Sequence, residues 1–490
     1  MAHVRAIVKT LVAAWFAAFC GAGLVSGQMP QAPPTRTQLY GEVAALKTAG
    51  GIPKQDLAKA KLAFEAFAKF HADYVSYPKT YTAPQEFRSE PPPPGSPLTI
   101  DQLINNEINR HILVPSPIPV PNPVGNQPGF ALASGPNDAD YIRELGIALD
   151  KSLGDVVRQS NDRIVRVNAA RMLAAAARSG AHAHYPTITE LITNPNTDPE
   201  VRYYALQGAA NLLAAYDLND YRSRKHSNGP KEVGALIVAV QDAVLKADAL
   251  LPVTQVAAGK DVQKVVPPDQ VPVLQFIRRQ AVRALGQVRF AEFEVEKNTK
   301  LYPAHTLALV ALSRVPIPTY KLDGDKVEVV AAPKTLGDSA DAAEAVLGIL
   351  NMAPPKGGAA AKQYAAPMAY VVASGVATWA APRATNPADK SLPWKGTAAR
   401  MEDGLKTWQG LFDVNFNPAQ PSIKADLVPA PVAGVSKAIT DNVLNPMNSP
   451  TGTVAVNLLL AFQKDVLRQD KGLTPQPFLP PTPPPALPIP

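Results

Sequence analysis

Cysteine is almost absent from this chain of 490 residues, in which Cys20 is the only one. A disulfide within the chain needs two cysteines, and a zinc site built on thiolates also needs more than one. Neither device can therefore cross-link this chain. The fold has to be held by its hydrophobic core.

Charge of either sign is sparse as well. Lys and Arg number 48 and Asp and Glu number 41, which leaves a formal net charge of +7. This mild excess is far from the dense basic patches that bind nucleic acid. We therefore expect no nucleic-acid partner, and at most a loose attraction to anionic surfaces.

Local catalytic motifs are missing too. The chain has no Gly-x-Ser-x-Gly elbow, no His-Glu-x-x-His helix and no phosphate-binding loop. Gly357-Gly358 runs into alanines without the Lys-Ser/Thr that such a loop needs. Asp323 and Asp325 lie close together in the sequence, but a calcium site needs more oxygen ligands than these two residues provide. We expect no enzyme activity, cofactor or metal. A hydrolase whose residues come from distant positions is the least favoured alternative.

The first 27 residues have the pattern of a secretory signal peptide. Arg5 and Lys9 precede an uncharged, mostly apolar stretch from Leu11 to Val25, and small residues surround Gly27. The stretch is shorter than the roughly 20 residues of a membrane-spanning helix. We predict export to the periplasm or the extracellular space, with cleavage after Gly27 and no membrane span in the mature chain. An uncleaved anchor is the alternative.

Cleavage would change both the number of cysteines and the net charge. Cys20 would be lost, and the bulky Phe19 before it argues against lipidation of that cysteine. The loss of Arg5 and Lys9, with no acidic residue, would lower the net charge from +7 to +5.

Proline, in contrast, is abundant: its 51 residues are about twice the usual share of ~5%. It is clustered, and such runs interrupt helices and favour polyproline II. We predict a linker at 78–137, containing one short helix from Thr99 to His111, and a proline-rich tail at 471–490. Within the tail, nine of the sixteen residues 475–490 are proline. The tail can serve as a stiff spacer or dock in an aromatic groove.

Residues 28–77 predict a small helical module. From Leu57 to Tyr74 the large apolar residues Phe64, Phe67 and Phe70 share one helical face, and Lys61 begins a ladder of alternating charges on another. This pattern predicts a helix with one buried face.

Helical periodicity is almost continuous from residue 138 to residue 470. In Tyr320 to Val330 we weigh a short hairpin but favour an ordered loop. We interpret the uncharged stretch Gln363 to Pro382 as a buried helix that is too weakly apolar for a membrane span. The predicted helices are Ala139–Gln159, Asp162–Ser179, Thr187–Thr193, Pro199–Tyr216, Lys231–Leu251, Val273–Phe290, Ala304–Arg314, Ala340–Met352, Gln363–Ala381, Thr397–Phe412, Val432–Leu444 and Thr451–Arg468.

One helical unit recurs within this region. Asp162-x-x-Val165-Arg166 is repeated 36 residues later as Asp198-x-x-Val201-Arg202, and a third copy without the Asp lies at Ile277-Arg278. Each has Ala three positions after the Arg. The unit resembles the second helix of a HEAT repeat, over 138–316, with helices continuing through 317–470. The resemblance implies an all-α fold, an α-solenoid of HEAT-like helical repeats with proline-rich linkers and tail.

The residues of the repeat unit then have expected places. Val165, Ala169 and Leu173 form an inward stripe, as do Val201, Ala205 and Leu212 in the second copy. Asp198 is placed to cap its helix, with Pro199 in the first turn. For Arg166, Arg202 and Arg278 we expect structural roles, pairing with a neighbouring Asp or a helix end rather than with a partner.

His182 and His184 are the most suggestive pair for metal binding. A closed metal site needs one or two further ligands, and the nearest acid in the sequence, Glu190, is not at helical spacing from either histidine. We interpret both as solvated loop histidines.

The HEAT-like resemblance implies a scaffold that binds another protein. We expect partner contacts from two expanded loops, 217–230 and 252–272, of which the first carries the basic residues Arg222, Arg224 and Lys225. The alternative is a structural component of the cell envelope that contacts an anionic polymer.

Overall fold

The computed structural model describes part of the chain. The predicted signal peptide, the proline-rich tail, the helix predicted at Thr451–Arg468 and the basic residues Arg222, Arg224 and Lys225 lie outside the described residues. The described residues are 43, 57–76, 100–112, 114–115, 130–131, 138–216, 229–246, 254–258, 261–265, 271–296, 299–312, 319–323, 326–331, 339–355, 358–385, 394–412 and 430–444.

Helices dominate the described residues, which confirms the all-α prediction at the level of fold class. The helices are α3 (Leu57–Val75), α5 (Ile100–Gln102), η2 (Leu103–Ile108), α6 (Asn109–Ile112), α7 (Asp138–Gln159), α8 (Arg163–Ala176), η3 (Ala177–Ser179), α9 (His184–Thr193), α10 (Pro199–Ala215), α12 (Gly229–Leu245), α13 (Val271–Leu285), α14 (Pro303–Ala311), α15 (Ser339–Leu350), α16 (Gly358–Thr385), α17 (Trp394–Leu411), α18 (Ala430–Ile439) and η7 (Thr440–Leu444).

Strands in the described part form four antiparallel pairs. They are β1 (Val114–Pro115) with β2 (Phe130–Ala131), β3 (Thr254–Ala258) with β4 (Asp261–Val265), β5 (Phe293–Glu296) with β6 (Thr299–Leu301), and β7 (Thr319–Asp323) with β8 (Lys326–Ala331).

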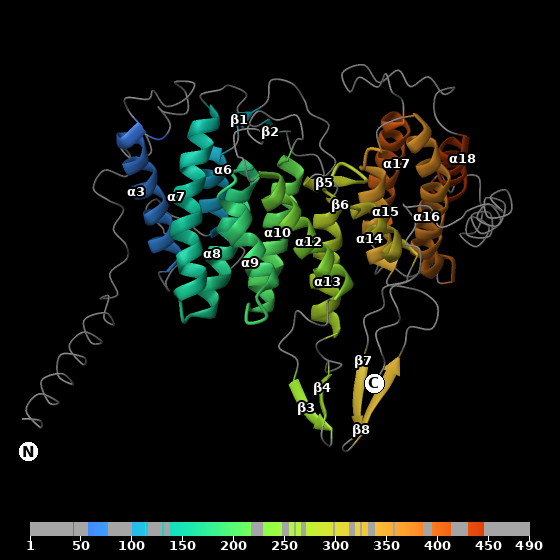
Figure 1. The fold of residues 1–490 in the computed structure, drawn as a ribbon, viewed down its shortest axis with the longest axis horizontal. Coiled ribbons are helices and arrows are strands. Elements are labelled where there is room, and N and C mark those ends of the chain that lie inside the picture. Colours follow the sequence, from blue (N-terminus) through green and yellow to red (C-terminus); the bar gives the residue numbers. More distant parts are fainter. Residues whose placement is uncertain are drawn as a thin grey trace, which may run out of the picture.

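Two of these pairs correct the sequence analysis. The ordered loop favoured for Tyr320 to Val330 is wrong, because β7 and β8 pair there with Asp323 opposite Lys326. The segment 252–272, expected as a loop, contains the β3–β4 hairpin. Alternating β-branched residues in β8 outweigh the surrounding helical pattern. β4 contacts β7, and the two hairpins project together from the lower edge of the helices (Figure 1).

Figure 1 shows the helices following one another from α3 on the left to α18 on the right, and their contacts arrange them in two rows. Successive helices pack in pairs: α7 with α8, α9 with α10, α12 with α13, and α14 with α15. The first helices of these pairs, followed by α16 and α18, pack on one another in the order α7, α9, α12, α14, α16 and α18, which we call the first row. The second helices of the pairs, followed by α17, pack in the order α8, α10, α13, α15 and α17, which we call the second row. Helix α13 therefore lies directly beside α10, although their matching arginines are 76 residues apart.

The repeat unit forms the buried face of the second row. Val165, Ala169 and Leu173 in α8 are at most 4% exposed, and Val201, Ala205 and Leu212 in α10 at most 3%, so the predicted inward stripe is confirmed. Small alanines at the centre of each stripe allow the helices of neighbouring pairs to approach closely.

Helix α3 begins the array. Its phenylalanine face is buried as predicted, and Phe64 meets Tyr141 of α7 edge to face, with ring centroids 5.2 Å apart. Lys61 reaches Glu144 of α7 at 3.5 Å, while Lys69 pairs with Asp73 one turn on. The predicted module is thus in direct contact with the first helix of the repeat region.

Helix α16 covers the uncharged stretch and is buried along its described centre, from Tyr364 to Trp379. Among the helices that the structure describes, none has both the length and the apolar character needed to cross a membrane.

Candidate functional site

The arginine of the first repeat joins two helix ends. Arg166 donates from Nη1 to the carbonyl of Ser160, just after α7, at 2.8 Å, and its Nε and Nη2 bind Asp198 Oδ2 at 2.8 and 2.7 Å. Asp198 precedes α10, so this arginine holds one pair to the next. The expected capping role of Asp198 is wrong, because its side chain makes no cap hydrogen bond and is bound to Arg166. Asp162 caps α8 instead, accepting from the backbone N–H of Ile164 at 2.8 Å.

The arginine of the second repeat is fully buried. Arg202 donates from Nε to the carbonyl of Ile192 at 3.1 Å and from Nη2 to that of Asn194 at 2.6 Å, at the end of α9. Burial lowers the pKa of the Arg202 guanidinium to about 10, so the group stays charged at neutral pH. A cation at a helix C-terminus also complements the helix dipole.

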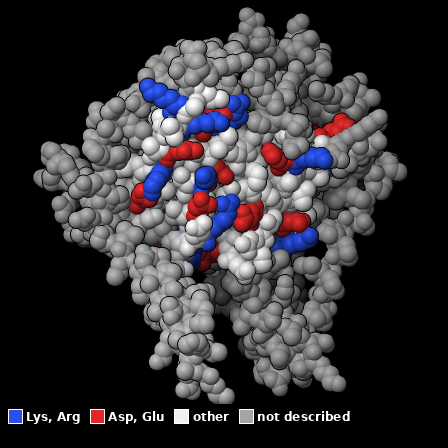
Figure 2. Space-filling view, turned by 60° about the vertical axis from the view of Figure 1, so that its left-hand side comes forward, with Lys and Arg blue, Asp and Glu red and all other residues white. Residues whose placement is uncertain are grey.

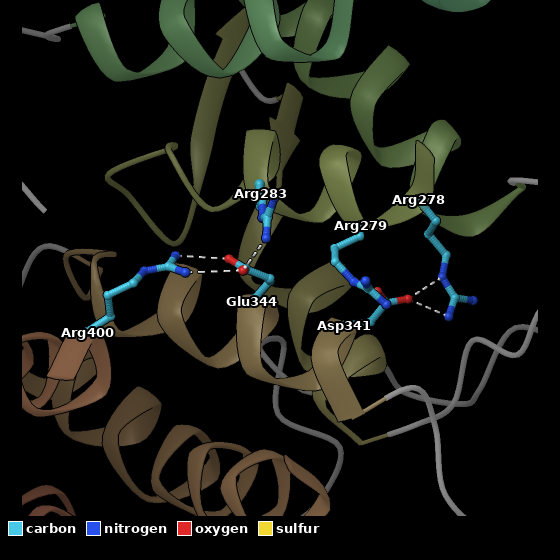
Figure 3. A network of polar contacts seen from close by, with 6 residues as sticks. All are labelled: Arg278, Arg279, Arg283, Asp341, Glu344 and Arg400. Atoms are coloured by element: carbon cyan, nitrogen blue, oxygen red, sulfur yellow. Dashed lines mark hydrogen bonds and ion pairs between the residues drawn. The ribbon is translucent and has the colours of Figure 1, made fainter. Parts of the chain in front are cut away.

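The third arginine belongs to a larger network in the second row, formed by Arg278, Arg279, Arg283, Asp341, Glu344 and Arg400 (Figure 3). Arg278 and Arg279 of α13 both bind Asp341 of α15, which is 1% exposed. Figure 3 shows Glu344 between two further arginines, Arg283 of α13 and Arg400 of α17. The structural roles predicted for Arg166, Arg202 and Arg278 are thus confirmed.

Glu344 shows how the network compensates for burial. Burial alone would raise the pKa of this carboxyl, but hydrogen bonds and charges from Arg400 and Arg283 outweigh it and leave the pKa below its ordinary value. The carboxylate is therefore charged at neutral pH and holds three helices of the second row together.

The two histidines are placed differently from the prediction. His184 is the first residue of α9 and is fully buried, with Nδ1 3.1 Å from Asp150 Oδ1 of α7. His182 Nδ1 lies 3.3 Å from Glu232 Oε2 of α12. His182 does lie in the turn before α9, but the interpretation as solvated loop histidines is wrong for His184, which is helical. Neither side chain is solvated, since they are 10% and 0% exposed and each lies against an acid of another first-row helix.

These histidine contacts join α7, α9 and α12. Thr187 donates to Asp150 Oδ2 at 2.8 Å, so both oxygens of that carboxylate are used. Within the described residues, no group of three or more His, Cys, Asp and Glu side chains is placed to hold a metal ion.

The outer side of the second row carries an aromatic cluster, formed by Tyr203, Tyr204 and Phe276, which we call the aromatic patch. The rings of Tyr203 in α10 and Phe276 in α13 are stacked, 4.6 Å apart and inclined by 17°. Tyr204 meets Tyr203 edge to face at 5.3 Å. Phe276 is 52% exposed, and of the large hydrophobic side chains that the described part of the chain leaves exposed, it is the only phenylalanine.

Position in the repeat explains why the patch faces outward. Phe276 stands two residues before Arg278, as Ile164 stands two residues before Arg166, and Ile164 is 51% exposed. On α13, Arg279 and Arg283 follow Phe276 at three and seven positions, which places them on the same helical side. The aromatic patch therefore borders the arginine network.

Charge around the patch is mixed. Arg163 of α8 pairs with Glu200 of α10, one turn before Tyr203. Figure 2 shows blue and red side chains side by side over the described part of one face, with uncharged side chains between them. The arrangement favours pairing within the surface over a broad field of one sign.

No family model, curated protein or solved structure matches this chain.

Sequence reasoning did not find the aromatic patch. The residues it selected as partner contacts, Arg222, Arg224 and Lys225, lie outside the described residues and stay a prediction. One feature of the sequence does point to the patch. Ile164 and Phe276 each stand two residues before a repeat arginine, so both copies place a large apolar residue on the solvent side of the helix.

Proposed function

We propose that this chain is an exported, non-catalytic scaffold that binds another protein through the surface of a HEAT-like α-solenoid. The observation that carries the proposal is the aromatic patch, in which the half-exposed Phe276 stacks on the partly buried Tyr203 on the outer side of the second row. Exposed aromatic rings beside arginines are typical of the residues that dominate protein interfaces.

The solenoid part of the proposal is supported by the order of packing. Each helix pair contacts the pairs before and after it, and arginines at matching positions in α8 and α13 bind an acid at the beginning of the next second-row helix. Repeats of two helices that bury their faces against neighbours are the defining arrangement of such arrays.

A capture experiment tests the function. Tagged wild-type chain is expected to retain a specific partner from the native exported fraction, and Phe276→Ser is expected to lose it. Ile164→Ser is the matched control, because Ile164 has the same repeat position and nearly the same exposure but no aromatic neighbour in the patch.

A second arm addresses the residues predicted from the sequence. Replacing Arg222, Arg224 and Lys225 together by Ala is expected to slow capture and to weaken its salt dependence. Capture that is unchanged in both the Phe276→Ser and the loop variant, with circular dichroism showing intact helices, would reject the proposed surface.

Export is tested separately. The intact mass of protein recovered from the exported fraction should correspond to a chain that begins at Gln28. A mass that retains Met1 would contradict cleavage after Gly27.

A further inference from the structure

The aromatic patch offers a chemistry that the proposed function does not specify. It combines flat apolar rings with hydrogen-bond donors. Burial raises the pKa of the Tyr203 phenol. The charge of Arg283 lowers this pKa and Tyr204 raises it, and the net effect is upward, so the hydroxyl keeps its proton at neutral pH. Arg283, whose side chain is 42% exposed, adds guanidinium N–H groups at the border of the patch.

Polyproline II segments match this chemistry. Their proline rings pack on aromatic faces, and their carbonyls accept hydrogen bonds because no internal hydrogen bond uses them. The segment is also preformed, so little conformational entropy is lost when it binds.

The chain carries such a segment at its own end. Residues 472–490 contain no charged side chain, and Pro477, Pro480 and Pro483 recur at the three-residue period of polyproline II, which places them on one edge.

The tail is long enough to reach the patch. From Leu444 at the end of η7 to Pro475 there are 31 residues, with an extended reach of roughly 100 Å. If the 18 residues Thr451–Arg468 form the predicted helix, the reach is still about 70 Å. The path from α18 to the patch crosses α16, α15 and α13, at about 10 Å for each packing step. The reach therefore exceeds the path in either case.

We propose that residues 475–490 dock on the aromatic patch of their own chain and cover it. The docking does not require a partner. Its regulatory meaning rests on the proposed function, because a docked tail would compete with a partner for Tyr203 and Phe276.

The test uses a labelled peptide of residues 475–490 and fluorescence anisotropy. The wild-type chain is compared with a full-length proline variant, in which Pro477, Pro480 and Pro483 are replaced by Ser. An attached tail has an effective concentration of about 1 mM, so for a peptide with a Kd of about 100 µM it should weaken binding roughly 10-fold. The proline variant is therefore expected to bind the peptide about 10-fold more tightly than the wild type.

Substitutions in the patch locate the site. In the proline variant, Phe276→Ser is expected to weaken peptide binding at least about 10-fold, and Tyr203→Phe less, because it removes only the hydroxyl. Ile164→Ser should leave the affinity unchanged. Because residues 475–490 have no charged side chain, raising the salt from about 50 to 500 mM should change the affinity less than about twofold when both ends of the peptide are blocked.

Several results would overturn the inference. Equal peptide affinity of wild type and proline variant, or no binding to either, would show that the attached tail does not cover the patch. Unchanged affinity in Phe276→Ser would place the site elsewhere. A doubled mass in light scattering that the proline variant loses would assign the site to the tail of a second copy. Partner capture that depends on Phe276 would uphold the proposed function in each of these cases.

Discussion

Arg278 and Asp341 form a two-bond ion pair in the interior of the second row. Nε and Nη2 of Arg278 lie 2.8 and 2.6 Å from the same oxygen, Asp341 Oδ2, and the two side chains are 5% and 1% exposed. The other oxygen of Asp341 accepts from Arg279 at 2.9 Å. One carboxylate therefore binds two arginines of the neighbouring helix.

Removing that carboxylate should be costly. Asp341→Ala would remove the carboxylate that binds both Arg278 and Arg279 in the interior, and we expect a loss of about 3–5 kcal/mol in the free energy of unfolding. Urea titration followed by circular dichroism measures the loss. Asp403→Ala is the control, since Asp403 is 83% exposed and only 4.0 Å from Lys406. Its expected change is within about 0.5 kcal/mol, and a similar loss in both variants would contradict the role of the network.

Glu344 predicts a pH dependence of stability. Its pKa is lower in the folded chain than its ordinary value of 4.5, so its contribution is present above that pH and is lost as the pH falls through the folded pKa. Glu344→Gln should lower the free energy of unfolding by roughly 2 kcal/mol at pH 7. The difference from wild type should shrink below about pH 4.5. Urea titrations between pH 3 and pH 7 measure it, with the half-exposed Glu402→Gln as control. A difference that is independent of pH would contradict the assignment.

Two adjacent residues of α8 test the inward stripe. Val165 is 4% exposed and Ile164 is 51% exposed. Val165→Asp would place a carboxylate against neighbouring helices and should destabilise the chain by several kcal/mol, roughly 3 or more. Ile164→Asp lies in the first turn of the same helix, where a negative charge is tolerated, and should change stability little. Thermal melting compares them, and Ala205→Glu in α10 should behave like Val165→Asp. Similar melting temperatures for the two α8 variants would show that the stripe is not the core.

The crossing of α13 and α15 depends on two glycines. A Cβ added at Gly348 would lie 2.7 Å from the Cα of Gly286, and one at Gly286 would lie 2.8 Å from the Cα of Gly348. Because the obstacle is backbone, the helices must separate, and Gly348→Ala should cost about 1–3 kcal/mol. Gly396→Ala is the matched control in α17, where nothing lies within 4 Å. Gly396→Ala should raise the free energy of unfolding by about 0.5–1 kcal/mol, because alanine has the higher helix propensity. Urea titration measures both variants, and a gain in stability for Gly348→Ala as well would contradict the close approach of the two backbones.

The sequence predicts those features that depend on local periodicity. The helix over Pro199–Tyr216 agrees with α10 to within one residue, because Pro199 marks its first turn and the apolar spacing continues to its end. The repeat pattern predicts that its arginines bind an Asp or a helix end, and Arg166 binds both. Alignment of the copies indicates this structural role, because an arginine that recurs at the same position beside a buried stripe needs an acid or a carbonyl group to bind its charge in each copy.

Features that depend on tertiary contacts were not visible. Asp150 is 34 residues from His184 and binds it only because α7 and α9 pack together, and this contact also extends α9 by three residues before the predicted Thr187. Asp341 lies 63 residues from Arg278, outside the recognisable signature. Tyr203 and Phe276 stack across two helices separated by a long insertion, and periodicity within either helix does not indicate the contact.

The order in which the helix pairs contact each other also bears on how the chain responds to force. Each pair from α7 to α15 is held chiefly by the pairs on either side, so pulling on the two ends would load the contacts in series rather than in parallel. A terminal pair can then detach while the interior pairs keep both neighbours. Extension of a single molecule would therefore proceed as a sawtooth of small steps, and relaxation would restore the array from whichever pairs had stayed folded.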